Sequence, residues 1–202
     1  MRKRGFLIAI EGIDGSGKTT ICKWLVKLFN DHGYEAIYTF EPTNSKFVEA
    51  LKNYEDIRSA ELDALVYAAD RLVHLKKLVI PALSRGAIIV MDRYYYSSIA
   101  YQGAMGAPIE WVIEINRYAI RPDLAIYIDV EPEIGLARIR GKKSKRFPEY
   151  EKLELLRKVR DIYLKLVEMG WLKMVDGRRD IELVKNDVLR LIEYELHVPL
   201  RR

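Results

Sequence analysis

A glycine-rich stretch near the N-terminus constrains this chain more than any other feature. Gly12, Gly17, Lys18 and Thr19 fit the pattern G-x-x-x-x-G-K-[ST]. Glycines let a backbone wrap closely round an anion, and a helix that begins there directs its N-terminal amides at the same anion. The lysine adds a mobile positive charge near the β- and γ-phosphates, and the threonine hydroxyl can hold Mg²⁺. The stretch therefore predicts a loop that binds a phosphate chain.

The sequence on both sides of this loop has the pattern that such a loop requires. Residues 6–10 form a short apolar run of the length of a buried strand. After the loop, Ile21, Leu25, Leu28 and Phe29 recur at helical spacing. Strand, glycine-rich loop and helix in this order argue against a chance match in a turn.

Along the rest of the chain, strand-like runs alternate with helical patterns, which is typical of a parallel α/β sheet. We expect one domain over residues 1–202 that resembles the three-layer α/β/α architecture of P-loop NTPases, with a five-stranded parallel sheet and a short basic lid. Strands are predicted near residues 6–11, 35–40, 87–92, 124–130 and 171–175. Helices are predicted near residues 18–32, 45–53, 59–85, 109–120, 132–141, 149–169 and 180–196, and Leu62, Leu65, Ala69 and Leu72 are the expected packing stripe of the third.

The net charge of +5 invites the interpretation that the protein binds nucleic acid. However, residues 138–146 alone contain six basic side chains and no acidic one, so a single cluster accounts for the excess. A basic loop after a helix, with Gly141 as its hinge, suits a lid over residues 138–148 that closes on a triphosphate. A solvated run of charges is the alternative. We expect no nucleic-acid partner.

Two features of composition bear on the cellular setting. No apolar run approaches the ~20 residues that a membrane span needs, so we expect no membrane partner. Cys22 is the only cysteine, which rules out an internal disulfide and favours a cytoplasmic location. We expect Cys22 to be a packing residue.

The most apolar predicted strand, residues 87–91, is followed by Asp92 and Arg93. Apolar residues and then an acid at the end of a strand match the Walker B pattern, in which the acid holds Mg²⁺ directly or through water. Arg93 places a planar cation where two phosphates would meet, and a bidentate clamp suits arginine better than lysine.

Two further stretches are candidates for binding a second ligand. Glu41 and Pro42 follow the second strand, where side chains face the ligand crevice of a parallel sheet. Tyr67 and Arg71 lie four residues apart on one helical face, so the ring could stack on a flat base while the guanidinium bonds its edge. The alternatives are a solvated acid for Glu41 and an ordinary surface tyrosine and ion pair for the other two.

The run from Tyr94 to Gly103 is dense in hydroxyl groups and aromatic rings, which suits recognition of a sugar and a base. For Tyr95 and Tyr96 a place in the core or in an interface is the favoured interpretation.

Taken together, these stretches resemble the thymidylate kinase family, whose members phosphorylate dTMP. The matching motifs keep the family's order over about residues 6–178, and the run Asp-Arg…Ser…Ala-Tyr-Gln-Gly is the most specific of them. They are residues 10–20, Glu41-Pro42, Ala69-Asp70-Arg71, Asp92-Arg93-Tyr94, Ser97-Ser98, Ala100-Tyr101-Gln102-Gly103 and Arg146-Phe147.

The resemblance implies a role for each residue on the acceptor side. Asp14 would accept the 3′-hydroxyl of the substrate, and Arg93 would hold the acceptor phosphate. Tyr101 would pack under the sugar and exclude a 2′-hydroxyl. Tyr67 would stack on the base and Arg71 would bond its edge, while Ser98 and Gln102 would line the pocket. Glu41 would face the phosphates or their metal. The resemblance also implies a homodimer.

This chain departs from the family pattern at two places. The family's second motif usually reads Arg-Glu-Pro-Gly-Gly-Thr, whereas residues 40–45 read Phe-Glu-Pro-Thr-Asn-Ser. Some members carry an arginine inside the phosphate loop and have no arginines in the lid; here that position is Gly15 and the lid is strongly basic. We therefore assign the transition-state cation to the lid, with Arg146 first.

The predicted reaction is transfer of the γ-phosphoryl group of ATP to dTMP, giving dTDP and ADP, with Mg²⁺ as cofactor and ATP and dTMP as small-molecule partners. A kinase for another monophosphate or for a nucleoside, and a non-enzymatic nucleotide-gated binding protein, remain as alternatives. A GTPase is disfavoured because the chain has no Asn-Lys-x-Asp motif.

The predicted catalytic residues are Lys18, Arg93 and Arg146, and the predicted metal ligands are Thr19 and Asp92. The predicted ATP-binding residues are Gly12, Ile13, Asp14, Gly15, Ser16, Gly17, Lys18, Thr19, Thr20, Arg138 and Arg140. The predicted substrate-binding residues are Asp14, Glu41, Pro42, Tyr67, Arg71, Arg93, Ser98, Tyr101 and Gln102.

Overall fold

The structure, a computed structural model, describes residues 5–139 and 152–198. Within these residues the chain forms a parallel sheet. Its five strands lie in the order β2-β3-β1-β4-β5, and every neighbouring pair is parallel. The strands are β1 (Leu7–Glu11), β2 (Ala36–Phe40), β3 (Ile88–Asp92), β4 (Leu124–Asp129) and β5 (Lys173–Asp176). The predicted fold class and all five predicted strands are confirmed.

Strand β1 lies at the centre of the sheet, between β3 and β4. All its side chains are buried, as expected for a parallel strand with helices on both faces. In such sheets a ligand binds outside the carboxyl ends of the strands, where the connections on two sides of a strand diverge. The end of β1, and the glycine-rich loop that follows it, occupy this position.

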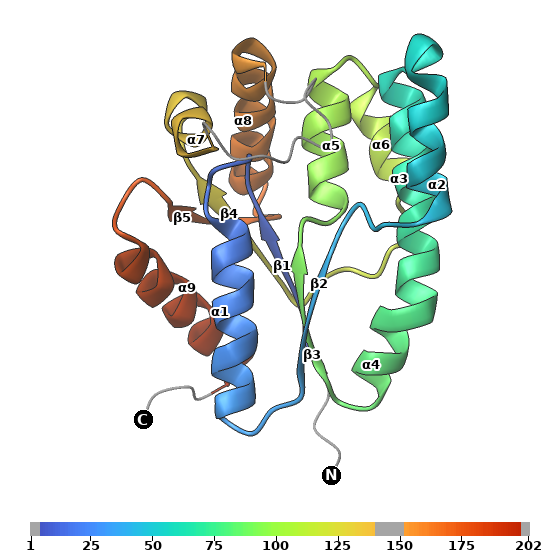
Figure 1. Ribbon diagram of the computed structural model, residues 1–202. Helices are drawn as coiled ribbons and strands as arrows, with labels where there is room; N and C mark the ends of the chain where they lie inside the picture. The colour runs from blue at the N-terminus through green and yellow to red at the C-terminus, as the bar shows by residue number, and fades with distance from the viewer. Residues whose placement is uncertain (1–4, 140–151, 199–202) are drawn as a thin grey trace.

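Helices cover both faces of the sheet (Figure 1). One face packs against α1 (Lys18–Asp31) and α9 (Ile181–Leu196), through a core that includes Ile10, Leu25 and Val188. The other face packs against a core that includes Met91, Ile99 and Tyr163, to which α3 (Ala60–His74), α5 (Tyr95–Ala104) and α8 (Leu153–Glu168) contribute. Cys22 is fully buried on α1, which confirms it as a packing residue.

The helix predicted for residues 59–85 is present but not uniform. It consists of α3, a π-helical turn at Leu75–Val79 and α4 (Ile80–Ser84). Pro81 has no N–H group and its ring crowds the preceding turn, and a π-helical turn is one way in which a helix accommodates such a break. The predicted packing stripe of this helix is wrong. Leu65 is half exposed, and the buried face carries polar residues, including Asp63, Asp70, Arg71 and His74.

The remaining helices differ from prediction mainly at their ends. Residues 45–53 form α2 (Lys46–Ala50), followed by a 3₁₀ segment (Leu51–Ile57). Helix α6 (Ile109–Ile115) ends five residues before the predicted end, and α7 covers Pro132–Ile139. Helix α5 was not predicted at all, because its tyrosines and serines have weak helix propensity. Its apolar contacts to the core supply the stability instead.

No helix among the described residues is long and apolar enough to cross a membrane.

Candidate active site

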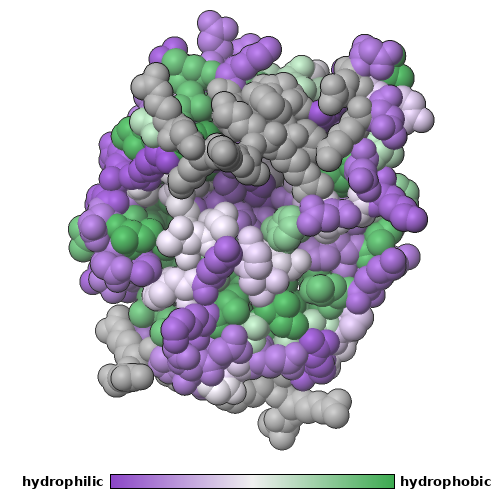
Figure 2. Space-filling view, in the orientation of Figure 1, coloured by the Kyte–Doolittle hydropathy of each residue, from purple (hydrophilic) through white to green (hydrophobic). Residues whose placement is uncertain are grey.

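The glycine-rich loop joins β1 to the N-terminus of α1, as predicted. Gly12, Gly15 and Gly17 all have positive φ angles, of 149°, 83° and 95°, which residues with a side chain rarely adopt. Gly17 is the N-cap of α1, so the first amides of this helix are directed into the loop. A hollow of about 720 Å³ lies at this point, lined by residues 14–20 together with Arg138, Ile139, Gly177, Arg179, Ile181 and Val184. The face shown in Figure 2 is hollowed above α1, and hydrophilic residues lie in the hollow.

Three charged side chains converge beside the loop. Lys18 Nζ lies 3.0 Å from Asp14 Oδ1, and Arg93 Nη2 lies 2.7 Å from the same oxygen. The two cations hold the pKa of the Asp14 carboxyl well below its usual range. Because Arg93 follows β3, this cluster joins the phosphate loop to the neighbouring strand. The fold therefore brings three predicted site residues from two segments into direct contact.

The two predicted metal ligands also meet. Thr19 Oγ1 donates a hydrogen bond of 2.5 Å to Asp92 Oδ2, so the two side chains are in direct contact. Tyr38 on β2 donates a second hydrogen bond to this oxygen, at 3.2 Å. The sequence analysis did not identify Tyr38. Its only signal is its place on the strand beside β3, where its register partner is Val90, two residues before Asp92.

Arg93 has an unusual backbone. Its φ angle of 68° lies in the left-handed region, which costs a residue with a side chain on the order of 1–3 kcal/mol. Its guanidinium donates to Ser97 Oγ at 3.1 Å and to the Tyr101 hydroxyl at 3.3 Å, and it lies 5.0 Å from the centre of the Tyr101 ring. Strain of this kind persists where the surrounding contacts hold the residue, and here they direct the cation towards the phosphate loop.

Arg71 is the centre of a second buried cluster. Its Nε donates to Glu41 Oε2 at 2.6 Å and its Nη2 to Ser98 Oγ at 3.2 Å, while its Nη1 donates to Asn116 Oδ1. Glu41 also contacts the ring of His74, at 3.0 Å from Nδ1. The structure thus brings the predicted residues Glu41, Arg71 and Ser98 together, and it places Glu41 against the arginine.

Sequence reasoning missed Asn116 and gave no role to His74. The spacing of three residues from Arg71 places His74 near the same helical face. No local pattern marks Asn116, which caps the end of α6 and reaches Arg71 only through the packing of α6 on α3.

Four other predicted acceptor-side residues lie on α3, on α5 or in the loop after β2, as the predicted residues of the Arg71 cluster do. Tyr101 and Gln102 are buried on α5, and Tyr67 is buried on α3 with its hydroxyl 3.2 Å from Arg58 Nη2. Pro42 belongs to the loop after β2, where Asp70 accepts hydrogen bonds from the amide and the hydroxyl of Thr43. Tyr96 is buried in the core, as predicted, and its hydroxyl accepts a hydrogen bond of 2.9 Å from that of Tyr95.

On the opposite side of the hollow, Arg138 joins α7 to the turn after β5. Its Nη1 donates to the carbonyl oxygen of Gly177 at 2.9 Å and contacts that of Gly15 at 3.4 Å, and its Nη2 contacts the carbonyl oxygen of Arg178 at 3.3 Å. Arg138, predicted to bind ATP, therefore borders the phosphate loop. Arg140, Arg146 and most of the predicted lid lie outside the described residues.

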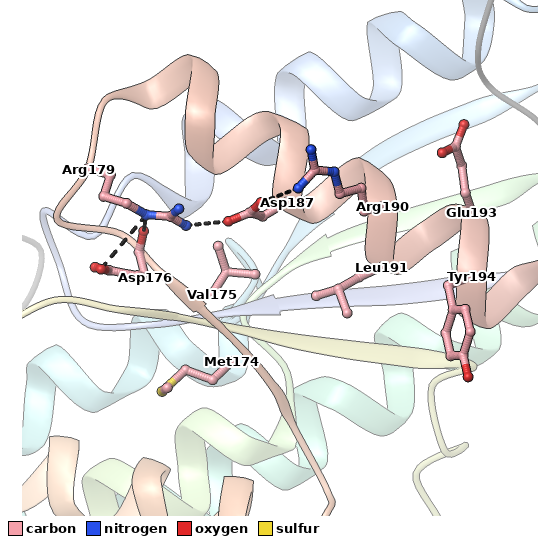
Figure 3. Close-up of a pocket in the computed structure, with 9 residues that line it drawn as sticks. All are labelled: Met174, Val175, Asp176, Arg179, Asp187, Arg190, Leu191, Glu193 and Tyr194. Carbon is pink, nitrogen blue, oxygen red and sulfur yellow. Dashed lines mark hydrogen bonds and ion pairs between the residues drawn. The ribbon is translucent and has the colours of Figure 1, made fainter.

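A second hollow, of about 1020 Å³, lies between β5 and α9 (Figure 3). Its basic side chains pair with its own acids: Arg179 with Asp176 and Asp187, and Arg190 with Asp187. Tyr194 lies at the far end, away from these pairs (Figure 3). None of the predicted site residues lines this hollow, so the candidate active site is the hollow at the phosphate loop.

The sequence profile of the thymidylate kinase family matches residues 10–188, which include the phosphate loop, Glu41, Arg71 and the Asp92-Arg93 pair. The chain belongs to the thymidylate kinase family. Proteins named probable thymidylate kinase in Staphylothermus marinus and Pyrococcus horikoshii are 53% and 43% identical to it. The first alignment covers 93% of this chain and 94% of the relative, and the second covers 96% and 98%. A thymidylate kinase of Xylella fastidiosa is 38% identical over 97% of this chain and 90% of its own.

Proposed function

We propose that this thymidylate kinase family member transfers the γ-phosphoryl group of ATP to the 5′-phosphate of dTMP, giving ADP and dTDP. The observation that carries the proposal is the meeting of Lys18, Asp14 and Arg93 at one point. Lys18 belongs to the loop that would hold the donor, and Arg93 precedes the helix that carries the acceptor motif. A donor and an acceptor phosphate brought to this point would be adjacent.

At the donor end, the amides of residues 12–20 and Lys18 would bind the phosphate chain. Arg138, with the turn at Gly177, would border the adenine. Arg140 and Arg146 would complete the site from the lid, with Arg146 stabilising the charge of the transition state.

Thr19 and Asp92 fit a magnesium site. Both offer oxygen, and the two oxygens lie 2.5 Å apart. Mg²⁺ commonly uses one or two protein oxygens and completes its shell with water and substrate phosphates. When bound, the ion would neutralise charge on the phosphate oxygens. Tyr38 would orient the Asp92 carboxylate.

At the acceptor end, Arg93 would hold the 5′-phosphate of dTMP and Asp14 the 3′-hydroxyl. Arg71 would donate to a carbonyl oxygen on the base edge, with Tyr67, Ser98 and Gln102 around the ring and Tyr101 under the sugar. Glu41 and Pro42 would form the wall behind Arg71. The acceptor phosphate is already ionised at neutral pH, so no strong general base is needed. Catalysis would come from positioning and from neutralisation of charge.

We also propose that two copies associate, as the family resemblance implies, in a cytoplasmic setting. Ile57 and Leu65 are large apolar residues with exposed fractions of 64% and 50%, and they are candidates for the contact. Sedimentation equilibrium should give twice the chain mass of 23.6 kDa. A monomer at all concentrations tested would contradict this proposal.

The function is tested by ADP release with ATP and Mg²⁺ against a panel of acceptors: dTMP, dUMP, the ribose form of TMP, dCMP, dGMP, AMP and thymidine. We expect turnover to be led by dTMP, weaker with the ribose form and absent with thymidine. Turnover led by another monophosphate would contradict the assigned base pocket. ATP binding without turnover on any acceptor would support a nucleotide-gated binding protein instead.

A further inference from the structure

Strand β1 holds the backbone on both sides of the strained residue Arg93. The amide of Arg93 donates to the carbonyl oxygen of Ile10 at 3.0 Å. The next amide, that of Tyr94, donates to a side chain, Glu11 Oε1, at 2.7 Å. The carbonyl oxygen of Asp92, in the peptide unit before Arg93, accepts from the amide of Glu41 at 3.1 Å. Backbone contacts therefore hold the peptide unit before Arg93, and the Glu11 carboxylate holds the one after it.

The other carboxylate oxygen of Glu11 receives two hydroxyl groups. Ser97 on α5 donates to Glu11 Oε2 at 2.6 Å, and Tyr163 on α8 donates to it at 2.9 Å. Since the Ser97 hydroxyl donates to Glu11, its oxygen can accept from Arg93 Nη1, which lies 3.1 Å away. The Tyr163 hydroxyl lies 2.9 Å from the same Ser97 oxygen. Glu11 thus contacts both the backbone next to Arg93 and the hydroxyl that receives its guanidinium.

Glu11 does not itself reach the ligand hollow. Its exposed fraction is zero, and it is not among the residues that line the hollow at the phosphate loop. A buried acid needs donors from the protein, and three are directed at Glu11: the amide of Tyr94, just before α5, and hydroxyl groups on α5 and α8. Its contacts therefore suit a residue that acts through a neighbour.

We propose that Glu11 is a positioning residue for Arg93, acting through the amide of Tyr94 and the hydroxyl of Ser97, and that Tyr163 completes this arrangement from α8. The inference rests on the proposed role of Arg93 in holding the acceptor phosphate. It adds three residues to the acceptor side, none of which touches the substrate in this scheme. Tyr163 lies 152 positions from Glu11, on the helix that follows the segment predicted as the lid.

The test compares Tyr163→Phe, Ser97→Ala and Glu11→Gln with a matched control, Tyr127→Phe. Tyr127 is equally buried and stacks on Tyr163, with ring centres 4.6 Å apart, but its hydroxyl donates to Asp129 instead of Glu11. We expect the first three to raise KM for dTMP about tenfold, the usual effect of losing one buried hydrogen bond, with KM for ATP unchanged. Ser97→Thr keeps the hydroxyl and should restore most of the dTMP affinity. The control should behave as the parent protein does.

A double-mutant cycle separates positioning from general damage. If Ser97 acts through Arg93, then Ser97→Ala should have no further effect, within about twofold, in an Arg93→Ala background. Effects that multiply in the double variant would overturn the inference. The inference is also overturned if Ser97→Ala and Tyr163→Phe have the same KM for dTMP as Tyr127→Phe, while Arg93→Ala raises it.

Failure of the proposed function gives a different result. If Arg93→Ala itself leaves KM for dTMP and kcat unchanged, then Arg93 does not hold the acceptor, and the inference falls with it. Circular dichroism and thermal unfolding identify any variant that does not fold. If Glu11→Gln is among these, Ser97→Ala and Tyr163→Phe decide the question, because each removes one hydroxyl group and retains the carboxylate.

Discussion

Gly15 in the phosphate loop lies directly against the backbone of Gly135 in α7. A β-carbon on Gly15 would be 2.1 Å from the carbonyl oxygen of Gly135, and a β-carbon on Gly135 would be 2.7 Å from that of Asp14. Both distances are shorter than real contacts of a β-carbon, so neither residue can carry a side chain unless the phosphate loop or α7 moves. This packing explains why an arginine at position 15, which some members of the family have, does not fit here.

We predict that Gly15→Ala lowers kcat at least tenfold, because the phosphate loop or α7 must shift and a shift of the loop misaligns the phosphates. Gly33→Ala is the control. Gly33 also has a positive φ angle, of 78°, but a β-carbon there would have no atom within 4 Å. It should lower the thermal midpoint through backbone strain and leave kcat unchanged. Normal turnover in Gly15→Ala would contradict the packing described above.

Lys18→Ala should lower kcat on the order of a hundredfold or more, because the closest mobile cation is lost from the phosphate chain. Lys27→Ala is a suitable control, since Lys27 lies on the same helix, is largely exposed and pairs with Asp31. Steady-state rates with ATP and dTMP give the comparison. If the Lys18 variant kept near-normal turnover, the assignment of the donor site would be wrong.

The ring of Tyr101 should set the preference for deoxyribose. Tyr101→Phe keeps the buried ring and loses only the hydroxyl, which lies 3.3 Å from Arg93 Nη2. It should preserve the ratio of kcat/KM for dTMP to that for the ribose form. Tyr101→Ala opens space under the sugar and should reduce that ratio about tenfold, since steric exclusion of one small group is worth roughly 1–3 kcal/mol. An unchanged ratio in Tyr101→Ala would place the sugar elsewhere.

Arg138→Ala should raise KM for ATP several-fold and leave KM for dTMP unchanged, because Arg138 holds the turn after β5 through the carbonyl oxygen of Gly177. Arg157→Ala is the matched control. Arg157 lies on α8 and pairs with Glu133, which is on α7 like Arg138. Arg157 does not line the hollow. Equal effects of the two variants on ATP would show that Arg138 does not border the donor.

The buried Glu11 predicts a pH dependence of stability. Burial raises the pKa of its carboxyl, although hydrogen bonds from Ser97, Tyr94 and Tyr163 and the charge of Arg93 oppose the rise. The folded state then binds this proton more tightly than the unfolded state does. The free energy of unfolding should therefore fall as pH rises above about 4.3, the ordinary value for glutamate.

Glu11→Gln removes this titration. The free energy of unfolding of the variant, minus that of the parent protein, should therefore increase between pH 4 and pH 7. Urea unfolding across this range measures the trend. A difference that does not change with pH, or that changes in the opposite direction, would contradict the raised pKa.

The candidate site was predictable where its residues follow one another along the chain. The loop from Gly12 to Thr20 carries its own geometry, since its glycines supply the positive φ angles and the following helix supplies the amides. Asp92 was found in the same way, at the end of an apolar strand. By contrast, the apolar stripe proposed for α3 failed. That helix buries Asp63, Asp70, Arg71 and His74 because each has a polar partner on another element or, for Asp63, on the preceding segment.

The sequence by itself determined the alternation of strands and helices, the phosphate loop and the Walker B acid, because each of these depends on residues close together in the chain. The family followed from the order of such short motifs along the chain. Only the tertiary structure decided which distant side chains meet. The contacts of Glu11 with Tyr163, of Arg71 with Asn116 and of Asp14 with Arg93 span 152, 45 and 79 positions. The physical reason is that the strand order and the packing of helices on the sheet set these pairs, and no local spacing encodes either of them.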